Sequence, residues 1–302
     1  MIKTPPYLKP GDTIGMVCPA GYMEAAKMQS CIAALKEWGY QVVCGKTVGG
    51  DSPTYFSGTD EERLWDIQHM LDNDEIKAVF CARGGYGMSR IIDRISFKQF
   101  RKLPKWVIGY SDITVLHSHI YSNFYISSLH APMASAFDNG EDKNEYVLSL
   151  RQVLEGKPIN YETGVHEYNR KGEVVGELVG GNLSLLAHII GTESELKTKG
   201  RILFIEDIGE YNYHIDRMMI QLKRSNKLSR LAGLVVGGFT DIKDTDRPFG
   251  NHVYDIIWDA VREYDYPVCF GFPVSHTKEN YALKIGVEYK LKVGKSKVAL
   301  EE

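Results

Sequence analysis

The 302-residue sequence is poor in the features that mark metal, redox and disulfide-rich proteins. It has no HExxH motif and no set of cysteines and histidines with zinc-site spacing. The cysteines are odd in number and without CxxC spacing, so they indicate no disulfide framework. Most lie in or beside predicted strands, and we expect all five to be reduced core residues: Cys18, Cys31, Cys44, Cys81 and Cys269.

Long apolar runs and clusters of positive charge are also missing. No segment approaches the about 18 consecutive apolar residues of a membrane-spanning helix, and residues 1–10 lack the apolar core of a signal peptide. The formal net charge is −3, and no group of lysines and arginines forms the basic stripe that a phosphate backbone would require. We therefore expect a cytoplasmic protein that binds neither nucleic acid nor membrane.

The chain is longer than a usual single domain, and we expect two. Residues 1–136 alternate strand and helix patterns, residues 137–170 are polar and irregular, and residues 171–302 contain further strands and helices. We interpret these segments as a first domain, an interdomain connection and a second domain. The class is α/β.

Five strands and three helices are predicted in the first domain. A Thr59–Glu62 capping box begins one helix, which we expect to run to about Leu71. Strands separated by helices of this length need crossover connections, so the sheet should be parallel with helices on both faces. The expected strands are 13–20, 40–44, 77–82, 105–110 and 124–128, and the other helices are 23–38 and 112–122.

The second domain shows a similar alternation and ends in an alternating pattern that predicts a hairpin with its turn near Gly294. The expected strands are 173–179, 201–205, 231–236 and 267–270, and the expected helices are 183–190, 215–223 and 253–264.

Ser111 follows a predicted strand and directly precedes a predicted helix. A serine at a sharp strand-to-helix turn projects its hydroxyl away from the sheet, and the helix N-terminus behind it offers unpaired N–H groups. This position favours acyl-transfer chemistry. Arg83, Gly84, Gly85 and Tyr86 follow another strand, so they should lie at the same edge of the sheet as Ser111.

A catalytic serine needs a base, and the sequence leaves two histidines open. His276 lies in the loop that follows the strand at 267–270, and His130 follows the strand at 124–128. Loop histidines next to strand ends are free to reach a cleft. His117 and His119 are two residues apart on one helix, so they point to different sides and cannot serve one serine together.

The base needs a carboxylate that fixes its tautomer, and Glu206 is the preferred candidate. It ends the apolar strand at 201–205, where a carboxylate is either at a functional edge or buried at considerable cost. Asp207 and Asp112 compete with it. Asp112 is also explained as a negative charge in the first turn of a helix.

An oxyanion hole requires two donors, and we expect the backbone N–H groups of Asp112 and of Gly84 or Gly85. Glycine permits the close approach of a backbone. The same glycines are also compatible with a simple tight turn or a weak phosphate-binding loop, because GGYG is not GxGxxG.

With these residues in view, the sequence resembles the serine LD-carboxypeptidases, the family of muramoyl-tetrapeptide carboxypeptidases and microcin C self-immunity hydrolases. The resemblance covers nearly the whole chain. It is carried by Pro19-Ala-Gly21, Phe56-Ser-Gly-Thr-Asp-Glu-Glu-Arg63, Ala82-Arg-Gly-Gly-Tyr-Gly87, Gly109-Tyr-Ser-Asp112, Gly180-Gly-Asn182, Ile205-Glu-Asp207 and Gly271-Phe-Pro-Val-Ser-His276.

The resemblance implies that Ser111 is the nucleophile, His276 the base and Glu206 its orienting carboxylate. It also implies a flavodoxin-like first domain, a smaller β-rich second domain, no metal or organic cofactor, and a homodimer. The implied reaction releases terminal D-alanine from cytoplasmic murein tetrapeptides. Where the family commonly reads His-Gly-Pro-Met, this chain has Ala131, whose methyl group could crowd the substrate.

Two residues of the glycine loop are candidates for binding the substrate peptide. Arg83 is the nearest cation for a terminal carboxylate, although it could instead pair with a structural carboxylate. Tyr86 is the second candidate. Two other functions remain open, namely an immunity-type hydrolase of peptidyl-nucleotide amides and a muropeptide-binding protein without catalysis.

Overall fold

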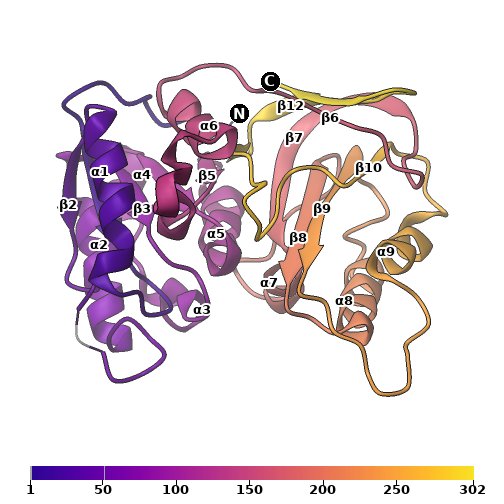
Figure 1. Cartoon of the computed structure of the whole chain (residues 1–302), viewed down its shortest axis with the longest axis horizontal. Coiled ribbons are helices and arrows are strands. Elements are labelled where there is room, and N and C mark those ends of the chain that lie inside the picture. The colour runs from indigo at the N-terminus through magenta and orange to yellow at the C-terminus, as the bar shows by residue number, and fades with distance from the viewer. Residues whose placement is uncertain (1, 51) are drawn as a thin grey trace. The chain divides into compact units, whose positions relative to one another are not determined.

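The computed structural model describes residues 2–50 and 52–302, which form two compact units (Figure 1). Unit 1 comprises Met1–Lys157 and Tyr281–Lys284, and unit 2 comprises Pro158–Asn280 and Ile285–Glu302. Among the described residues, no helix has the length and apolar character needed to cross a membrane.

Unit 1 is built on a six-stranded sheet with the order β11-β5-β4-β3-β1-β2. The pairs β1–β2, β1–β3, β3–β4 and β4–β5 are parallel, as the crossover pattern predicts. The order β2-β1-β3-β4-β5 is that of the flavodoxin-like fold. The bounds are β1 Thr13–Val17, β2 Gln41–Cys44, β3 Ile76–Cys81, β4 Trp106–Gly109, β5 Ser128–His130 and β11 Leu283–Ile285.

Six α-helices accompany this sheet in the described part of unit 1. Right-handed crossovers place the helix between β1 and β2 on one face and the helices of the later crossovers on the other. The packing agrees, because α1 contacts the 3-10 segment Ala134–Lys143, whereas α2 contacts α3 and α4. The bounds are α1 Gln29–Glu37, α2 Asp60–Asp72, α3 Met88–Ile91, α4 Lys98–Lys102, α5 Thr114–Phe124 and α6 Glu145–Leu154.

The predicted capping box at the start of α2 is present. Thr59 Oγ1 accepts from Glu62 N at 3.2 Å, and Glu62 Oε2 accepts from Thr59 N at 2.8 Å. These two bonds satisfy backbone donors at the helix N-terminus and fix where α2 begins.

One prediction for unit 1 and one for the segment 137–170 need correction. Helix α5 continues through Phe124 and ends at Tyr125, whose φ of 52° is left-handed, so the strand expected at 124–128 begins only at Ser128. The segment 137–170 is largely ordered rather than irregular, since it contains α6 and strand β6 (Asn160–Thr163).

Unit 2 is built on a seven-stranded sheet with the order β10-β9-β8-β7-β12-β13-β6. Its β7–β10 half is parallel and its β12, β13 and β6 half is antiparallel. The helices α7, α8 and α9 follow three of the parallel strands along the chain (Figure 1). The bounds are β7 Gly172–Asn182, α7 Leu183–His188, β8 Ile202–Ile208, α8 Asn212–Arg224, β9 Gly233–Thr240, α9 Val253–Val261, β10 Val268–Phe270, β12 Glu288–Val293 and β13 Val298–Glu301.

The predicted closing hairpin is formed by β12 and β13, and Gly294 N donates to Lys297 O at 3.0 Å in its turn. The residues that begin this alternating pattern do not belong to the hairpin. Leu283–Ile285 forms β11 at the edge of the unit 1 sheet. Alternation alone identifies a strand but not the sheet that it joins.

The cysteines follow the core prediction with one exception. All five are free thiols, and four of them are buried. Cys44 is exposed, because it lies on β2, the edge strand of the unit 1 sheet. The expectation that all five are core residues is therefore wrong for Cys44.

Candidate functional site

Ser111 occupies a strained turn between β4 and α5 in unit 1. Its φ is 63°, and it begins the 3-10 helix Ser111–Ile113 that leads directly into α5. The left-handed region costs a non-glycine residue about 1–2 kcal/mol, so such a conformation persists only where the surroundings hold it. A serine in a strained strand-turn-helix junction is the arrangement of a nucleophile elbow.

Gly109 and His117 hold this turn in place. A Cβ on Gly109 would lie 3.0 Å from Ile113 Cγ1 and 3.1 Å from Cys81 Cβ, so the turn packs closely only without a side chain. His117 Nε2 donates to Gly109 O at 2.8 Å. Burial lowers the pKa of His117 to about 4, so this imidazole is neutral and serves the backbone.

The glycine loop after β3 lies against the serine. A Cβ on Gly84 would lie 3.0 Å from Ser111 Cβ and 3.3 Å from Ser111 Oγ. Gly85 has a φ of 99°, a value that glycine adopts readily. Arg83 and Tyr86 in the same loop are exposed. The structure thus brings Ser111 and the glycines expected to form its oxyanion hole to one place in unit 1.

Asp112 ties the glycine loop to the serine turn through its carboxyl group. Its Oδ2 accepts from Met88 N at 2.8 Å, at the end of the glycine loop. Burial raises the pKa of Asp112 to about 6, while hydrogen bonds from Met88 and Gly87 and the charge of Arg63 oppose that rise. Its side chain is thus not a simple helix N-terminal charge.

Glu206 and His276 form a hydrogen-bonded pair in unit 2. His276 Nδ1 donates to Glu206 Oε2 at 2.5 Å, and the Glu206 side chain is fully buried. Burial alone would lower the pKa of His276, but the hydrogen bond and charge of Glu206, with the charge of Asp207, raise it above its ordinary value. This contact fixes the tautomer with the proton on Nδ1, which leaves Nε2 as the basic nitrogen.

Close backbone packing positions the loop that carries His276. A Cβ on Gly237 would lie 2.1 Å from Val274 O, and a Cβ on Gly238 would lie 2.6 Å from Ser275 Cβ. Gly238 N donates to Val274 O at 2.9 Å. Gly237 and Gly238 of β9 therefore let the loop lie directly on the strand.

Asp207, the competing carboxylate, is occupied by other donors. Its Oδ1 accepts from Asn182 Nδ2 at 2.8 Å, and its Oδ2 accepts from Ser184 N at 2.9 Å. Burial raises the pKa of Asp207 to about 7, and the neighbouring Glu206 charge adds to the rise. Asp207 thus organises the start of α7, whereas Glu206 meets the histidine.

The competing histidine, His130, is fully buried in β5 and packs its ring against Tyr110 at 5.6 Å between centroids. Ala131 beside it is also buried, and its N–H donates to Gly109 O at 3.3 Å. The backbone of Ala131 is therefore tied to Gly109, at the start of the serine turn.

Sequence reasoning missed Arg63, whose charged side chain is fully buried on α2. Arg63 lies within the motif of residues 56–63 that carries the resemblance, but the hydrophobic periodicity of a helix does not predict that an arginine is buried. The spacing of Asp60 and Arg63 at i and i+3 was the available signal, since such residues are neighbours on a helix face.

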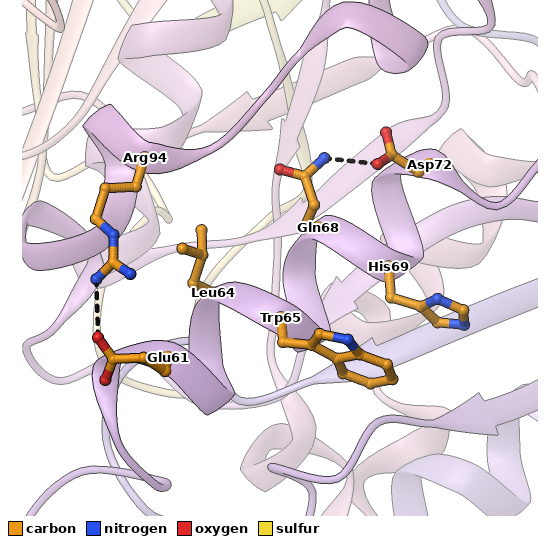
Figure 2. A pocket seen from close by; sticks show the side chains of 7 residues that line it. All are labelled: Glu61, Leu64, Trp65, Gln68, His69, Asp72 and Arg94. Atoms are coloured by element: carbon orange, nitrogen blue, oxygen red, sulfur yellow. Dashed lines mark hydrogen bonds and ion pairs between the residues drawn. The ribbon is translucent and has the colours of Figure 1, made fainter.

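A surface pocket on α2 contains none of the predicted site residues. It is lined by Glu61, Leu64, Trp65, Gln68, His69, Asp72 and Arg94. Figure 2 shows Arg94 pointing toward Glu61 and Gln68 pointing toward Asp72. Arg94 Nη1 donates to Glu61 Oε1 at 3.3 Å, and Gln68 Nε2 donates to Asp72 Oδ2 at 2.9 Å. The Trp65 and His69 rings stack at 5.0 Å, so the side chains of this pocket largely satisfy one another.

Comparison with known proteins identifies both halves of the chain. Residues 14–131 match the family model described as the LD-carboxypeptidase N-terminal domain, and residues 175–291 match the LD-carboxypeptidase C-terminal domain. The chain is 36% identical to the probable murein peptide carboxypeptidase of Bacillus subtilis, over 98% of this chain and 94% of that protein.

Two further proteins are similar over nearly the whole chain. The crystal structure of muramoyltetrapeptide carboxypeptidase from Oxalobacter formigenes superposes with a TM-score of 0.86 at 30% identity, covering 96% of this chain and 98% of that one. The microcin C7 self-immunity protein MccF of Escherichia coli is 25% identical, over 100% of this chain and 98% of that protein.

Proposed function

The chain belongs to the LD-carboxypeptidase family, and from this premise we propose that it is a cytoplasmic serine carboxypeptidase that removes terminal D-alanine from murein tetrapeptides. The bond cleaved joins an L-configured centre of a diamino acid to the D-alanine. The product would serve peptidoglycan recycling.

In the proposed first step, Ser111 Oγ attacks the carbonyl carbon of the scissile amide and His276 Nε2 takes the hydroxyl proton. Glu206 keeps the Nδ1 proton in place and stabilises the imidazolium that forms. Backbone N–H groups of Asp112 and of Gly84 or Gly85 stabilise the oxyanion. These roles need no metal or organic cofactor.

The tetrahedral species collapses when His276 returns its proton to the amine of D-alanine, which leaves. Water then attacks the acyl-enzyme ester, again with His276 as base, and the shortened peptide is released with Ser111 restored. The observation that carries this proposal is the 2.5 Å bond between His276 and the fully buried Glu206, in a chain that matches both domains of the family.

An exopeptidase also has to recognise the free carboxylate of its substrate, and we assign this role to Arg83, with Tyr86 beside it. Both are exposed in the loop whose Gly84 lies against Ser111. A guanidinium binds a carboxylate through two parallel hydrogen bonds. We also expect the chain to act as a homodimer.

The primary experiment offers the purified protein three substrates: the murein tetrapeptide, its epimer ending in L-alanine, and a peptidyl-nucleotide amide. We expect D-alanine release from the first alone. Faster turnover of the nucleotide amide would favour an immunity-type hydrolase. Calorimetric binding of the tetrapeptide without released D-alanine would indicate a binding protein.

Arg83→Ala tests the assigned carboxylate site. We expect KM for the tetrapeptide to rise about 10-fold or more while kcat changes little, since a charge-assisted bidentate bond is lost from binding. Arg94→Ala removes a similarly exposed arginine of unit 1 and is the matched control. An unchanged KM in folded Arg83→Ala protein would exclude this role.

A further inference from the structure

The guanidinium of Arg63 joins segments that follow two neighbouring strands of unit 1. Its Nη1 donates to Pro19 O at 2.7 Å, after β1, and to Gly87 O at 3.1 Å, after β3. Its Nη2 pairs with Asp60 in the first turn of α2. A single fully buried side chain thus fixes α2 and two loops at the carboxyl edge of the sheet.

Such a buried charge needs partners, because the free-energy cost of removing a lone guanidinium from water far exceeds the free energy gained from its packing. Asp60 is that partner, and Asp60 also pairs with Arg90 at 2.8 Å. The Phe56 ring lies 4.8 Å from Arg63 Cζ and covers one face of the guanidinium. The planar fork of an arginine suits this set of fixed contacts in a way that a lysine does not.

Gly87 is held from both sides. Arg63 binds its carbonyl oxygen, and Asp112 accepts from the next backbone N–H, that of Met88, at 2.8 Å. A Cβ on Gly87 would lie 2.6 Å from Arg63 Nη1, so the guanidinium lies directly against this residue. The end of the glycine loop is therefore clamped between Arg63 and the residue that follows the serine.

The clamped loop is the one that meets the serine at Gly84, where an added Cβ would lie 3.0 Å from Ser111 Cβ. Catalysis by backbone donors is sensitive to small displacements, and a shift of about 1 Å can cost about 100-fold in rate. Resting on the proposed function, we infer that Arg63 is a positioning residue that sets the oxyanion donors of the glycine loop against Ser111.

Arg63→Lys and Arg63→Met test this inference, with Arg94→Met as the matched control. Arg94 also lies in unit 1, but its side chain is 47% exposed. It forms a surface ion pair with Glu61, which Figure 2 shows. We expect both Arg63 variants to lower kcat about 10- to 100-fold with KM changed less than about threefold. Arg94→Met should match the wild type.

Two further readouts separate positioning from folding. Reaction of Ser111 with a fluorophosphonate should slow to a similar extent as kcat in the Arg63 variants. Millimolar guanidinium chloride should partly restore kcat in Arg63→Ala, and it should leave the unimpaired kcat of Arg94→Ala unchanged. Folded Arg63→Lys or Arg63→Met protein, judged by thermal melting, with wild-type kcat and wild-type labelling would overturn the inference.

Asp60→Asn provides the test if the Arg63 variants do not fold, because Asp60 is partly exposed and is paired only with the arginines Arg63 and Arg90 among the ion pairs of the described residues. We expect a smaller loss of kcat, about 2- to 10-fold, with the same unchanged KM. An unaltered kcat there would equally overturn the inference. If the wild type labels rapidly at Ser111 but does not cleave the tetrapeptide, the proposed function fails while the labelling rates still test Arg63.

Discussion

The two halves of the proposed catalytic machinery are held in place by different means. In unit 1, Ser111 is positioned by the backbone, through a left-handed turn and glycines whose missing side chains allow close approach. In unit 2, glycines of β9 also let the His276 loop pack closely, but the imidazole itself is held by a side chain, the buried carboxylate of Glu206. Substitutions in unit 1 should therefore act mainly through geometry, and substitutions in unit 2 mainly through charge and pH.

The largest effect should come from Ser111→Ala. Removing the nucleophile of a triad costs about as much as removing the whole triad, so we expect kcat to fall at least about 1,000-fold. Released D-alanine measures this directly. Ser225→Ala at the end of α8 serves as control. An unchanged rate in Ser111→Ala would remove the mechanism.

Glu206→Gln should have the second-largest effect. We expect kcat to fall about 100- to 10,000-fold, because the amide neither stabilises the imidazolium of His276 nor enforces its tautomer. The base must be neutral to act, so kcat/KM of the wild type should rise with pH through the raised pKa of His276. We expect this rise of kcat/KM to occur at lower pH in Glu206→Gln. An unshifted rise would show that another group limits the rate.

The pair of His276 and Glu206 should also affect the free energy of unfolding. The pKa of His276 is raised in the folded state, so its pairing stabilises the fold fully below the unfolded pKa of about 6.5 and loses that contribution as pH rises through the folded value. Urea unfolding of wild type and Glu206→Gln should therefore differ most in mild acid. A difference that grows with pH would contradict the assignment.

Gly84→Ala should act in unit 1 through space alone. The new methyl group would lie 3.0 Å from Ser111 Cβ, and the loop must move to accept it. We expect kcat to fall about 10- to 100-fold, in line with a displaced oxyanion donor, without a shift in the pH profile. Gly164→Ala, which would enter open space, is the control. A shifted pH profile in Gly84→Ala would contradict the claim that substitutions in unit 1 act through geometry rather than through charge.

The smallest effect concerns backbone strain at the nucleophile. Ser111→Gly should be more stable than Ser111→Ala by about 1 kcal/mol, because glycine adopts a φ of 63° without steric cost. Both variants should be inactive, so urea unfolding is the readout. Equal stability would mean that the turn is not strained.

The elements that depend on local pattern were predictable. The alternation of strand and helix patterns predicted that the sheet of unit 1 is parallel, and the Thr59–Glu62 spacing predicted the start of α2. The strand that begins at Ser128 was placed too early, because aromatic residues around Tyr125 fit the last turn of a helix as well as a strand. The destination of β11 was not predictable, since it depends on long-range pairing.

The candidate site divides in the same way. Ser111 could be singled out from its place between a strand and a helix, and Glu206 was preferred to Asp207 from its place at the end of an apolar strand. The structure adds that Asp207 accepts from other donors. His276 and His130 were left open by pattern alone. Arg63 was missed entirely, because a buried charge is specified by partners from distant loops rather than by its own sequence context.

The most direct test of the account is the site and rate of covalent labelling by a fluorophosphonate, followed by mass spectrometry of the wild type and His276→Ala. We predict a single adduct on Ser111 in the wild type and labelling at least about 100-fold slower in His276→Ala. An adduct on another residue, or equal labelling of the two proteins, would contradict the claim that the two regions act as one catalytic centre.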